Sequence, residues 1–104
     1  MKVVLSRAAA REFALAADWY EERTENQGIR FAEAVEAVLA SLPRAPRRPL
    51  RGFEDIGMQV VAFPKKWPYR VFCVERGDVL TVVAIAHNRR EPGYWLPRLD
   101  EGQV

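Results

Sequence analysis

Residues 86–95 concentrate the side chains of this sequence that are best suited to chemistry. Together with one arginine just beyond it, the block supplies His87, Arg89, Arg90, Tyr94, Trp95 and Arg98. Arginine presents forked donors that fit carboxylates and phosphates, while histidine and tyrosine can exchange protons. The block therefore suits three roles: a catalytic set, a docking surface for a larger partner, or a polar strand end followed by an anchor for the tail.

The composition predicts one domain, 1–104, with a single modest core, since 49% of the 104 residues are hydrophobic. No run reaches the roughly 18 apolar residues of a membrane span, so no membrane contact is expected. A signal peptide would need an unbroken apolar stretch near the N-terminus, and charged residues interrupt it here at Arg7, Arg11 and Glu12. The single cysteine, Cys73, cannot form an internal disulfide. We therefore expect a cytoplasmic protein.

The charge is unevenly distributed along the sequence. Residues 1–42 carry five Lys and Arg against seven Asp and Glu, a balance of −2, whereas residues 43–98 carry eleven against five, a balance of +6. A basic C-terminal half predicts an anionic partner, such as a nucleic acid, a nucleoprotein or an acidic protein segment. Ordinary scatter of surface charge is the alternative interpretation.

Two amphipathic helices are predicted in the first half. The helix at 6–24 begins with Ser6 as its N-cap, and the helix at 28–42 ends at Pro43, which cannot continue it. Their apolar stripes are Ala9, Phe13, Ala16, Ala17 and Tyr20 in the first, and Phe31, Val35, Val38, Leu39 and Leu42 in the second. The short connection between them predicts an antiparallel helical hairpin.

The second half is predicted to form a sheet. Residues 43–55 contain three prolines, four arginines and a glycine, which suits a connection rather than a helix or a central strand. Residues 56–86 then supply three strands, the last two joined by a tight turn at Gly77. With a possible short fourth strand, the expected ranges are 3–5, 56–63, 69–75 and 79–86. A C-terminal motif and tail, 87–104, follow.

The predicted fold class is therefore α+β, with an N-terminal antiparallel helical hairpin packed on a three- to four-stranded, mainly antiparallel sheet. The last two strands are nearly apolar on both faces, which is typical of covered central strands. One helical hairpin covers only one face of a sheet. The other face needs a partner, a second copy or the chain's own tail.

This order of elements, with PYRVF at residues 68–72 and HNRREPGYWLPR at 87–98, closely resembles the RelE/ParE superfamily of bacterial type II toxins. The block after the last strand is the most specific part, and it points to the ParE-like branch, also called plasmid-stabilisation proteins. The resemblance covers nearly the whole chain. It implies a growth-inhibiting toxin that a cognate antitoxin holds inactive, with a possible higher-order toxin–antitoxin assembly. No metal and no cofactor are expected.

The superfamily contains two mechanisms. ParE-like members bind DNA gyrase and trap it on cleaved DNA, with no chemistry of their own. RelE-like members cut messenger RNA in the ribosome, where Arg and Lys stabilise developing charge and positioned groups move protons. Plausible residue types occupy the positions of that ribonuclease pattern, namely Lys65, Arg70, Arg89 and Tyr94.

The motif HNRREPGYW nevertheless resembles that of the ParE-like branch, and no histidine follows it to serve as a C-terminal acid or base. We therefore predict a gyrase-binding toxin without catalytic residues. Its expected target-binding residues are His87, Arg89, Arg90, Tyr94, Trp95 and Arg98. The alternatives are a ribosome-dependent endoribonuclease that uses the four residues above, and an inactive relative kept as a partner-binding module.

These residues also have purely structural interpretations. His87 at a strand end could simply bond a backbone carbonyl, and Arg70 could pair with Glu54, Asp55 or a carboxylate of the tail. Tyr94 and Trp95 could pack back onto the sheet between the prolines that flank them. The sequence alone leaves these roles open beside the functional ones.

Overall fold

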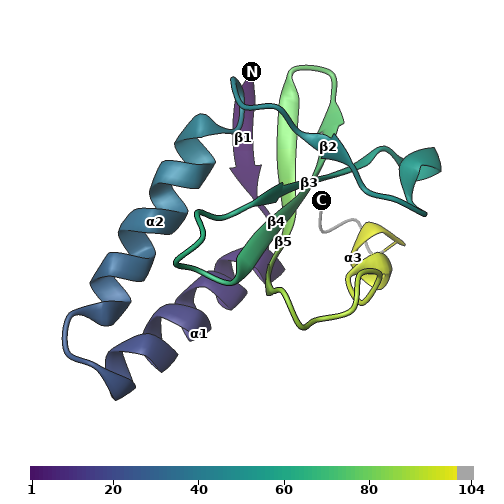
Figure 1. The fold of residues 1–104 in the computed structure, drawn as a ribbon. Helices are drawn as coiled ribbons and strands as arrows, with labels where there is room; N and C mark the ends of the chain where they lie inside the picture. The colour runs from purple at the N-terminus through teal and green to yellow at the C-terminus, as the bar shows by residue number, and fades with distance from the viewer. Residues whose placement is uncertain (101–104) are drawn as a thin grey trace.

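The structure is a computed structural model that describes residues 1–100 (Figure 1). Within that range, helices lie against a five-stranded sheet. In chain order the elements are β1 (Lys2–Leu5), α1 (Arg7–Arg23), α2 (Gln27–Ser41), β2 (Arg48–Pro49), the 3₁₀ helix η1 (Glu54–Ile56), β3 (Met58–Ala62), β4 (Tyr69–Arg76), β5 (Val79–His87) and α3 (Leu96–Asp100). None of the helices in this range is long and apolar enough to cross a membrane.

The fold is α+β, as the sequence predicts. The strand order is β1-β5-β4-β3-β2, with β1 parallel to β5 and the other neighbours antiparallel. The described sheet has one strand more than the three or four expected, because Arg48 and Pro49 in the connection pair with Val60 and Gln59. Pro49 is tolerated because β2 lies at the edge of the sheet, where a residue without an N–H donor breaks no ladder.

The turn between α1 and α2 fixes how closely the two helices approach. Asn26 adopts a left-handed conformation with φ of 67°, and the Glu21 carboxylate accepts hydrogen bonds of 3.0 Å from the backbone N–H groups of Asn26 and Gly28. A Cβ at Gly28 would come within 2.6 Å of the Ala17 carbonyl oxygen. Glycine is therefore required where α2 begins.

The two long helices cover one face of the sheet (Figure 1). An aromatic group fills the space between them and the strands. Phe31 of α2 has no exposed surface, and its ring centroid lies 4.9 to 6.1 Å from those of Tyr20, Phe63, Trp67 and Tyr69. Such tilted and edge-on contacts add to the burial of apolar surface, so this group anchors the hairpin to the sheet.

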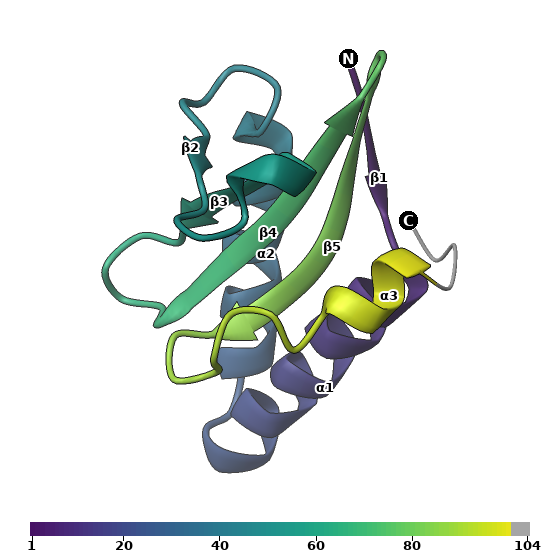
Figure 2. The same ribbon diagram turned by 90° about the vertical axis from the view of Figure 1, so that its right-hand side faces the viewer.

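The second face of the sheet is covered by the chain itself. Two parts of the chain pack on it: residues 50–53 of the connection and residues 94–99 of the C-terminal segment. In Figure 2, the C-terminal segment with α3 lies beside β5, near the start of α1. The apolar side chains of this second core include Leu50, Met58, Phe72, Val74, Val83 and Trp95. Of the three covers that the sequence allows, the chain's own tail is the one found, with help from the connection. The two-sided apolar strands thus do not require a partner.

A β-bulge interrupts the pairing of β4 with β5. Phe72 pairs with Ala84 and Cys73 pairs with Val82, so Val83 lies between them without a partner on β4. A bulged residue leaves the regular ladder and re-aims its backbone groups. The Val83 carbonyl consequently accepts hydrogen bonds from outside the sheet, from Ser6 Oγ at 3.3 Å and Arg98 Nη1 at 2.9 Å.

The aromatic group yields a stability prediction. Phe31→Ala should lower the free energy of unfolding by about 3–5 kcal/mol, because it removes a fully buried ring and leaves a cavity. Ile29→Ala, on the same helix but 60% exposed, should change it by less than about 0.5 kcal/mol. Urea denaturation of both variants measures the difference. Equal losses would show that α2 is not held by this core.

Candidate functional site

The end of β5 presents three of the expected target-binding residues. His87 is half-buried, while Arg89 and Arg90 are exposed in the turn that follows the strand. The Nδ1 atom of His87 accepts a hydrogen bond of 3.1 Å from the backbone N–H of Arg89, and its ring lies edge-on to Tyr69 at 5.3 Å. The histidine thus fixes the turn as an acceptor from a backbone N–H rather than as a donor to a carbonyl.

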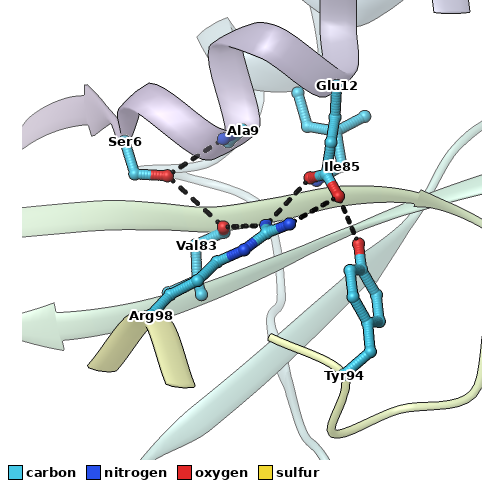
Figure 3. Close-up of polar contacts among 7 residues, drawn as sticks. All are labelled: Ser6, Ala9, Glu12, Val83, Ile85, Tyr94 and Arg98. Carbon is cyan, nitrogen blue, oxygen red and sulfur yellow. Dashed lines mark hydrogen bonds and ion pairs between the residues drawn. The ribbon is translucent and has the colours of Figure 1, made fainter. Parts of the chain in front are cut away.

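Tyr94 and Arg98 are held by a residue that the sequence did not single out, Glu12 of α1 (Figure 3). The Tyr94 hydroxyl donates to Glu12 Oε2 at 2.6 Å. Arg98 donates from Nη1 to Oε1 at 3.0 Å and from Nη2 to Oε2 at 2.9 Å, which makes a two-pronged ion pair. The backbone N–H of Ile85 donates to Oε1 at 3.0 Å. One carboxylate therefore joins α1, β5 and the C-terminal segment.

The position of this network follows from the sheet. The pairing of β1 with β5 ends at Leu5 opposite Val82, so β5 continues beyond its neighbour with an open edge. Open backbone groups near the core need other partners. Glu12 accepts from Ile85 N–H, and Arg98 donates to the Val83 carbonyl. Side chains therefore take the place of the missing strand.

The network also sets the electrostatics of the site. The side chains of Glu12 and Arg98 are each 18% exposed, so their ion pair is largely removed from water. The hydrogen bond to Glu12 raises the pKa of the Arg98 guanidinium. Burial, and then the hydrogen bond to Glu12, raises the pKa of the Tyr94 phenol well above its ordinary value. Tyr94 is therefore neutral at physiological pH and acts as a hydrogen-bond donor to Glu12, which makes it a poor general base.

Trp95 does not belong to the surface. It has no exposed area, and its ring centroid lies 5.2 Å from that of Phe53 and 5.4 Å from that of Phe72. The burial of Trp95 argues against its predicted role as a target contact, because a side chain inside the second core presents no surface to a partner. The structural interpretation, in which the tryptophan packs back onto the sheet, is the correct one.

A groove of about 610 Å³ lies between α1 and the end of β5. Besides Glu12 and several small or aromatic residues, it is lined by Leu15, Trp19, His87, Arg89, Arg90 and Tyr94. Leu15 and Trp19 are 61% and 49% exposed, so two large apolar side chains stand next to each other on the surface of α1. Their spacing of four residues outside the buried stripe of α1 is the one signal of this pair in the sequence.

Two of the four residues of the ribonuclease pattern, Arg89 and Tyr94, line the groove, and the other two, Lys65 and Arg70, do not line it. Lys65 is exposed in the turn between β3 and β4. Arg70 donates from Nη2 to the Arg90 carbonyl at 3.2 Å and lies 5.1 Å from the Phe72 ring centroid. Arg70 forms no ion pair with Glu54 or Asp55, and the carboxylates of the tail lie outside the described residues.

The chemistry of the described residues does not include an evident metal site. No group of three or more His, Cys, Asp or Glu side chains within residues 1–100 is arranged to hold an ion. Cys73 is buried in β4, and burial raises the pKa of its thiol to about 11, so it is unreactive at neutral pH.

Two similarities to known proteins identify the class of protein to which this chain belongs. A structure described as the chromosomal ParDE TA system from P. aeruginosa has the same fold, with a TM-score of 0.72 at 15% sequence identity over 84% of this chain and 95% of that chain. The family model of the ParE toxin of the type II toxin-antitoxin system parDE matches residues 3–92. The chain therefore belongs to the ParE toxin family. A comparison with curated proteins gave no match.

Family membership implies an antitoxin as partner, because the family is defined by a toxin–antitoxin system. The match ends before Tyr94 and Arg98, so the roles of these two residues rest on the geometry of this chain. That geometry unites His87, Arg89, Arg90 and Tyr94 at one groove and assigns Arg98 to holding the segment in place.

The Glu12 network leads to a second prediction. Glu12→Gln should reduce the free energy of unfolding by about 1–3 kcal/mol, because an amide offers one acceptor oxygen where four donor groups converge and leaves Arg98 without its counter-charge. Glu22→Gln, at an exposed position of the same helix, is the matched control. Thermal and urea unfolding of both proteins provide the measurement. A Glu12→Gln protein as stable as the control would show that the network contributes nothing.

The tyrosines give a third prediction, on pH dependence. Burial raises the pKa values of all three phenols, Tyr20, Tyr69 and Tyr94, and brings that of Tyr69 to about 12. Because folding raises these values above about 10, their stabilisation is fully present below pH 10 and is lost as the pH rises through about 12. Tyr94→Phe should lessen this alkaline loss. Phenolate absorbance, followed with urea unfolding, tests it; an ordinary titration near pH 10 in the folded protein would contradict it.

Proposed function

We propose that this toxin stops bacterial growth by binding DNA gyrase through the exposed end of β5, and that its cognate antitoxin neutralises it in the cytoplasm. The observation that carries the proposal is the placement of Arg89 and Arg90. Both are exposed, and neither forms an ion pair with any residue that the structure describes. Two unpaired guanidinium groups at the end of a rigid strand offer forked donors to carboxylates or phosphates of a large partner.

The surroundings of these arginines favour binding over catalysis. The guanidinium of Arg90 lies 3.9 Å from the Tyr94 ring centroid, and Glu12 fixes that ring from the other side. Side chains that are already ordered lose less conformational entropy when a partner binds. Tyr94 therefore supports Arg90, and its own hydroxyl is engaged within the protein.

The ribonuclease alternative has weaker support from the same geometry. It requires Lys65, Arg70, Arg89 and Tyr94 to act on one phosphate, whereas Lys65 and Arg70 lie outside the groove of the other two. It also requires a proton-transfer group, and the raised pKa of Tyr94 makes that phenol a poor base.

The fourth prediction tests the proposed target directly. Purified toxin should inhibit supercoiling by gyrase and leave coupled translation unaffected. Arg89→Ala and Arg90→Ala should each raise the toxin concentration needed for half-inhibition about tenfold, which is the effect of losing one charge-assisted contact. Arg44→Ala, an exposed arginine in the turn after α2, is the matched control and should inhibit like the unmodified protein.

The other outcomes of this experiment reject the proposal. Inhibited translation with active gyrase would place the protein among the ribonucleases, and Tyr94→Phe would then be expected to abolish RNA cleavage with ribosome affinity little changed. Inhibition of neither system would identify an inactive partner-binding module. Gyrase inhibition that is unchanged in both arginine variants would retain the target but move the docking surface elsewhere.

A further inference from the structure

Two turns meet at one end of the sheet, the turn between β3 and β4 and the turn after β5 (Figure 2). They meet because Arg70, near the start of β4, pairs with Ala62 of β3 on one side and with Ala86 of β5 on the other. The two turns and this strand carry five cations, which we call the basic end: Lys65, Lys66, Arg70, Arg89 and Arg90. The four cations on the turns are exposed.

Hydrogen bonds join the two turns into one surface. The backbone N–H of Asn88 donates to the Pro68 carbonyl at 2.8 Å, and Arg70 Nη2 donates to the Arg90 carbonyl at 3.2 Å. Groups that are already ordered lose less conformational entropy when a ligand binds. The basic end is therefore one rigid array of cations rather than two independent loops.

The basic end carries little compensating charge. Residues 62–70 and 86–92 contain five Lys and Arg against one acid, Glu91, a balance of +4. None of the five cations forms an ion pair with any residue that the structure describes. At the other end of the hairpin of β4 and β5, two acids, Glu75 and Asp78, flank a single arginine. The positive charge is thus concentrated at one end of the sheet, where it attracts a polyanion.

The basic end lacks the apolar anchors of a protein interface. The large apolar side chains that are exposed within residues 1–100 all lie elsewhere: Met1, Val4, Leu15, Trp19, Ile29, Ile56 and Leu96. Phe63 and Trp67, in the turn between β3 and β4, are only 6% and 7% exposed. Interfaces between proteins depend on such anchors, and single-stranded nucleic acids need open rings on which bases stack. A phosphate backbone needs neither, because cationic donors alone bind it.

We infer that the basic end binds the phosphate backbone of duplex DNA. The two turns leave the sheet from strands about 10 Å apart, since β4 separates β3 from β5 and neighbouring strands are about 4.8 Å apart. This spacing is comparable to the grooves of B-DNA, which are about 6 and 12 Å wide, so each turn can contact a different strand. The inference rests on the proposed function in one respect, because gyrase acts on duplex DNA. It assigns phosphates as the ligand of Arg89 and Arg90 and adds Lys65, Lys66 and Arg70.

The test measures the binding of a fluorescently labelled DNA duplex of mixed sequence to the purified full chain, by anisotropy at several salt concentrations. Five phosphate contacts should give a slope of about −4.5 in a plot of log K against log salt. Lys65→Ala and Lys66→Ala should each weaken binding about tenfold at about 50 mM salt, and each should make the slope shallower by about 1. Absence of binding at this salt concentration, or a slope near zero, would overturn the inference.

Matched controls come from the other end of the same strands. Lys2 is an exposed lysine of β1 opposite Val79, and Arg76 is an exposed arginine of β4 opposite the same residue. Lys2→Ala controls for the lysine variants and Arg76→Ala for Arg89→Ala, and both control proteins should bind DNA like the unmodified chain. Equal losses in controls and turn variants would show that binding follows net charge alone, against the inference. Thermal unfolding verifies that each variant is folded.

Two competitors identify the class of ligand. Unlabelled duplex RNA of the same sequence and polyglutamate of the same charge are compared with the unlabelled DNA duplex as displacers of the labelled DNA. The DNA duplex should displace it at the lowest concentration, because A-form RNA has grooves of different width and polyglutamate has no fixed spacing of charges. A competitor that equals or surpasses the DNA duplex would replace duplex DNA as the ligand and overturn the inference.

The DNA result and the gyrase result are distinguishable. A toxin that binds DNA through the basic end but leaves gyrase active retains the inference and loses the proposed target. A toxin that inhibits gyrase but binds no duplex keeps the target and loses the inference. The double variant Lys65→Ala, Lys66→Ala adds a direct link, because both lysines lie outside the groove at the end of β5. It should need about ten times more toxin for half-inhibition of gyrase, and unchanged inhibition would count against the inference.

Discussion

The carboxylate of Glu12 is the group on which the rest of the structure depends. It accepts hydrogen bonds from Ile85, Tyr94 and Arg98, which belong to a strand and to a segment more than seventy residues away in sequence. A largely buried ion pair is stable only when its remaining donors and acceptors are satisfied. Here both carboxylate oxygens have two partners, and Arg98 Nη1 donates to the Val83 carbonyl as well as to Glu12. The bulge at Val83 and the end of β1 at Leu5 leave backbone groups of β5 without strand partners, and this network supplies partners for them.

The network explains how the short segment 86–98 can contribute both to the core and to the surface. Trp95 fills the second core, while Tyr94 and Arg98 hold the segment against α1. With those three engaged, Arg89 and Arg90 remain exposed, and the half-buried His87 fixes the turn that carries them. The block that stands out in the sequence therefore divides into an anchor and a presented part. The presented part is rigid because the anchor is buried.

Much of the fold follows from local pattern. The helical stripes, the turn at Gly77 with φ of 60° and the short strand at the start are all readable from spacing and residue type. Two-sided apolar strands likewise indicate that both faces are covered. They do not indicate which element covers each face, because a hydrophobic pattern shows that a surface is buried but not what it packs against. The choice among partner, second copy and tail depends on packing between residues 50–53, 94–99 and the sheet.

The site was harder to predict for a related reason. Glu12 lies on a helix with a clear apolar stripe, and an acidic residue beside such a stripe ordinarily faces solvent. Its partners are 73 to 86 residues away, beyond the reach of any local rule. Trp95 could not be placed from the sequence, because an aromatic residue in such a block suits an interface and a core equally well. Leu15 and Trp19 were overlooked because an exposed apolar residue is common taken singly, and only the groove beside them gives the pair meaning.

The position of the C-terminal segment affects how this protein folds. Its contact between Arg98 and Glu12 closes a loop that spans most of the chain, as does the pairing of Lys2 in β1 with Val79 in β5. Distant pairings of this kind form slowly, because the entropy of closing a long loop is lost before any contact is gained. The anchor at 94–98 is synthesised after α1 and β5, the elements that it holds. A chain synthesised only as far as β5 therefore has a second face without Trp95 and lacks the fixed arginines.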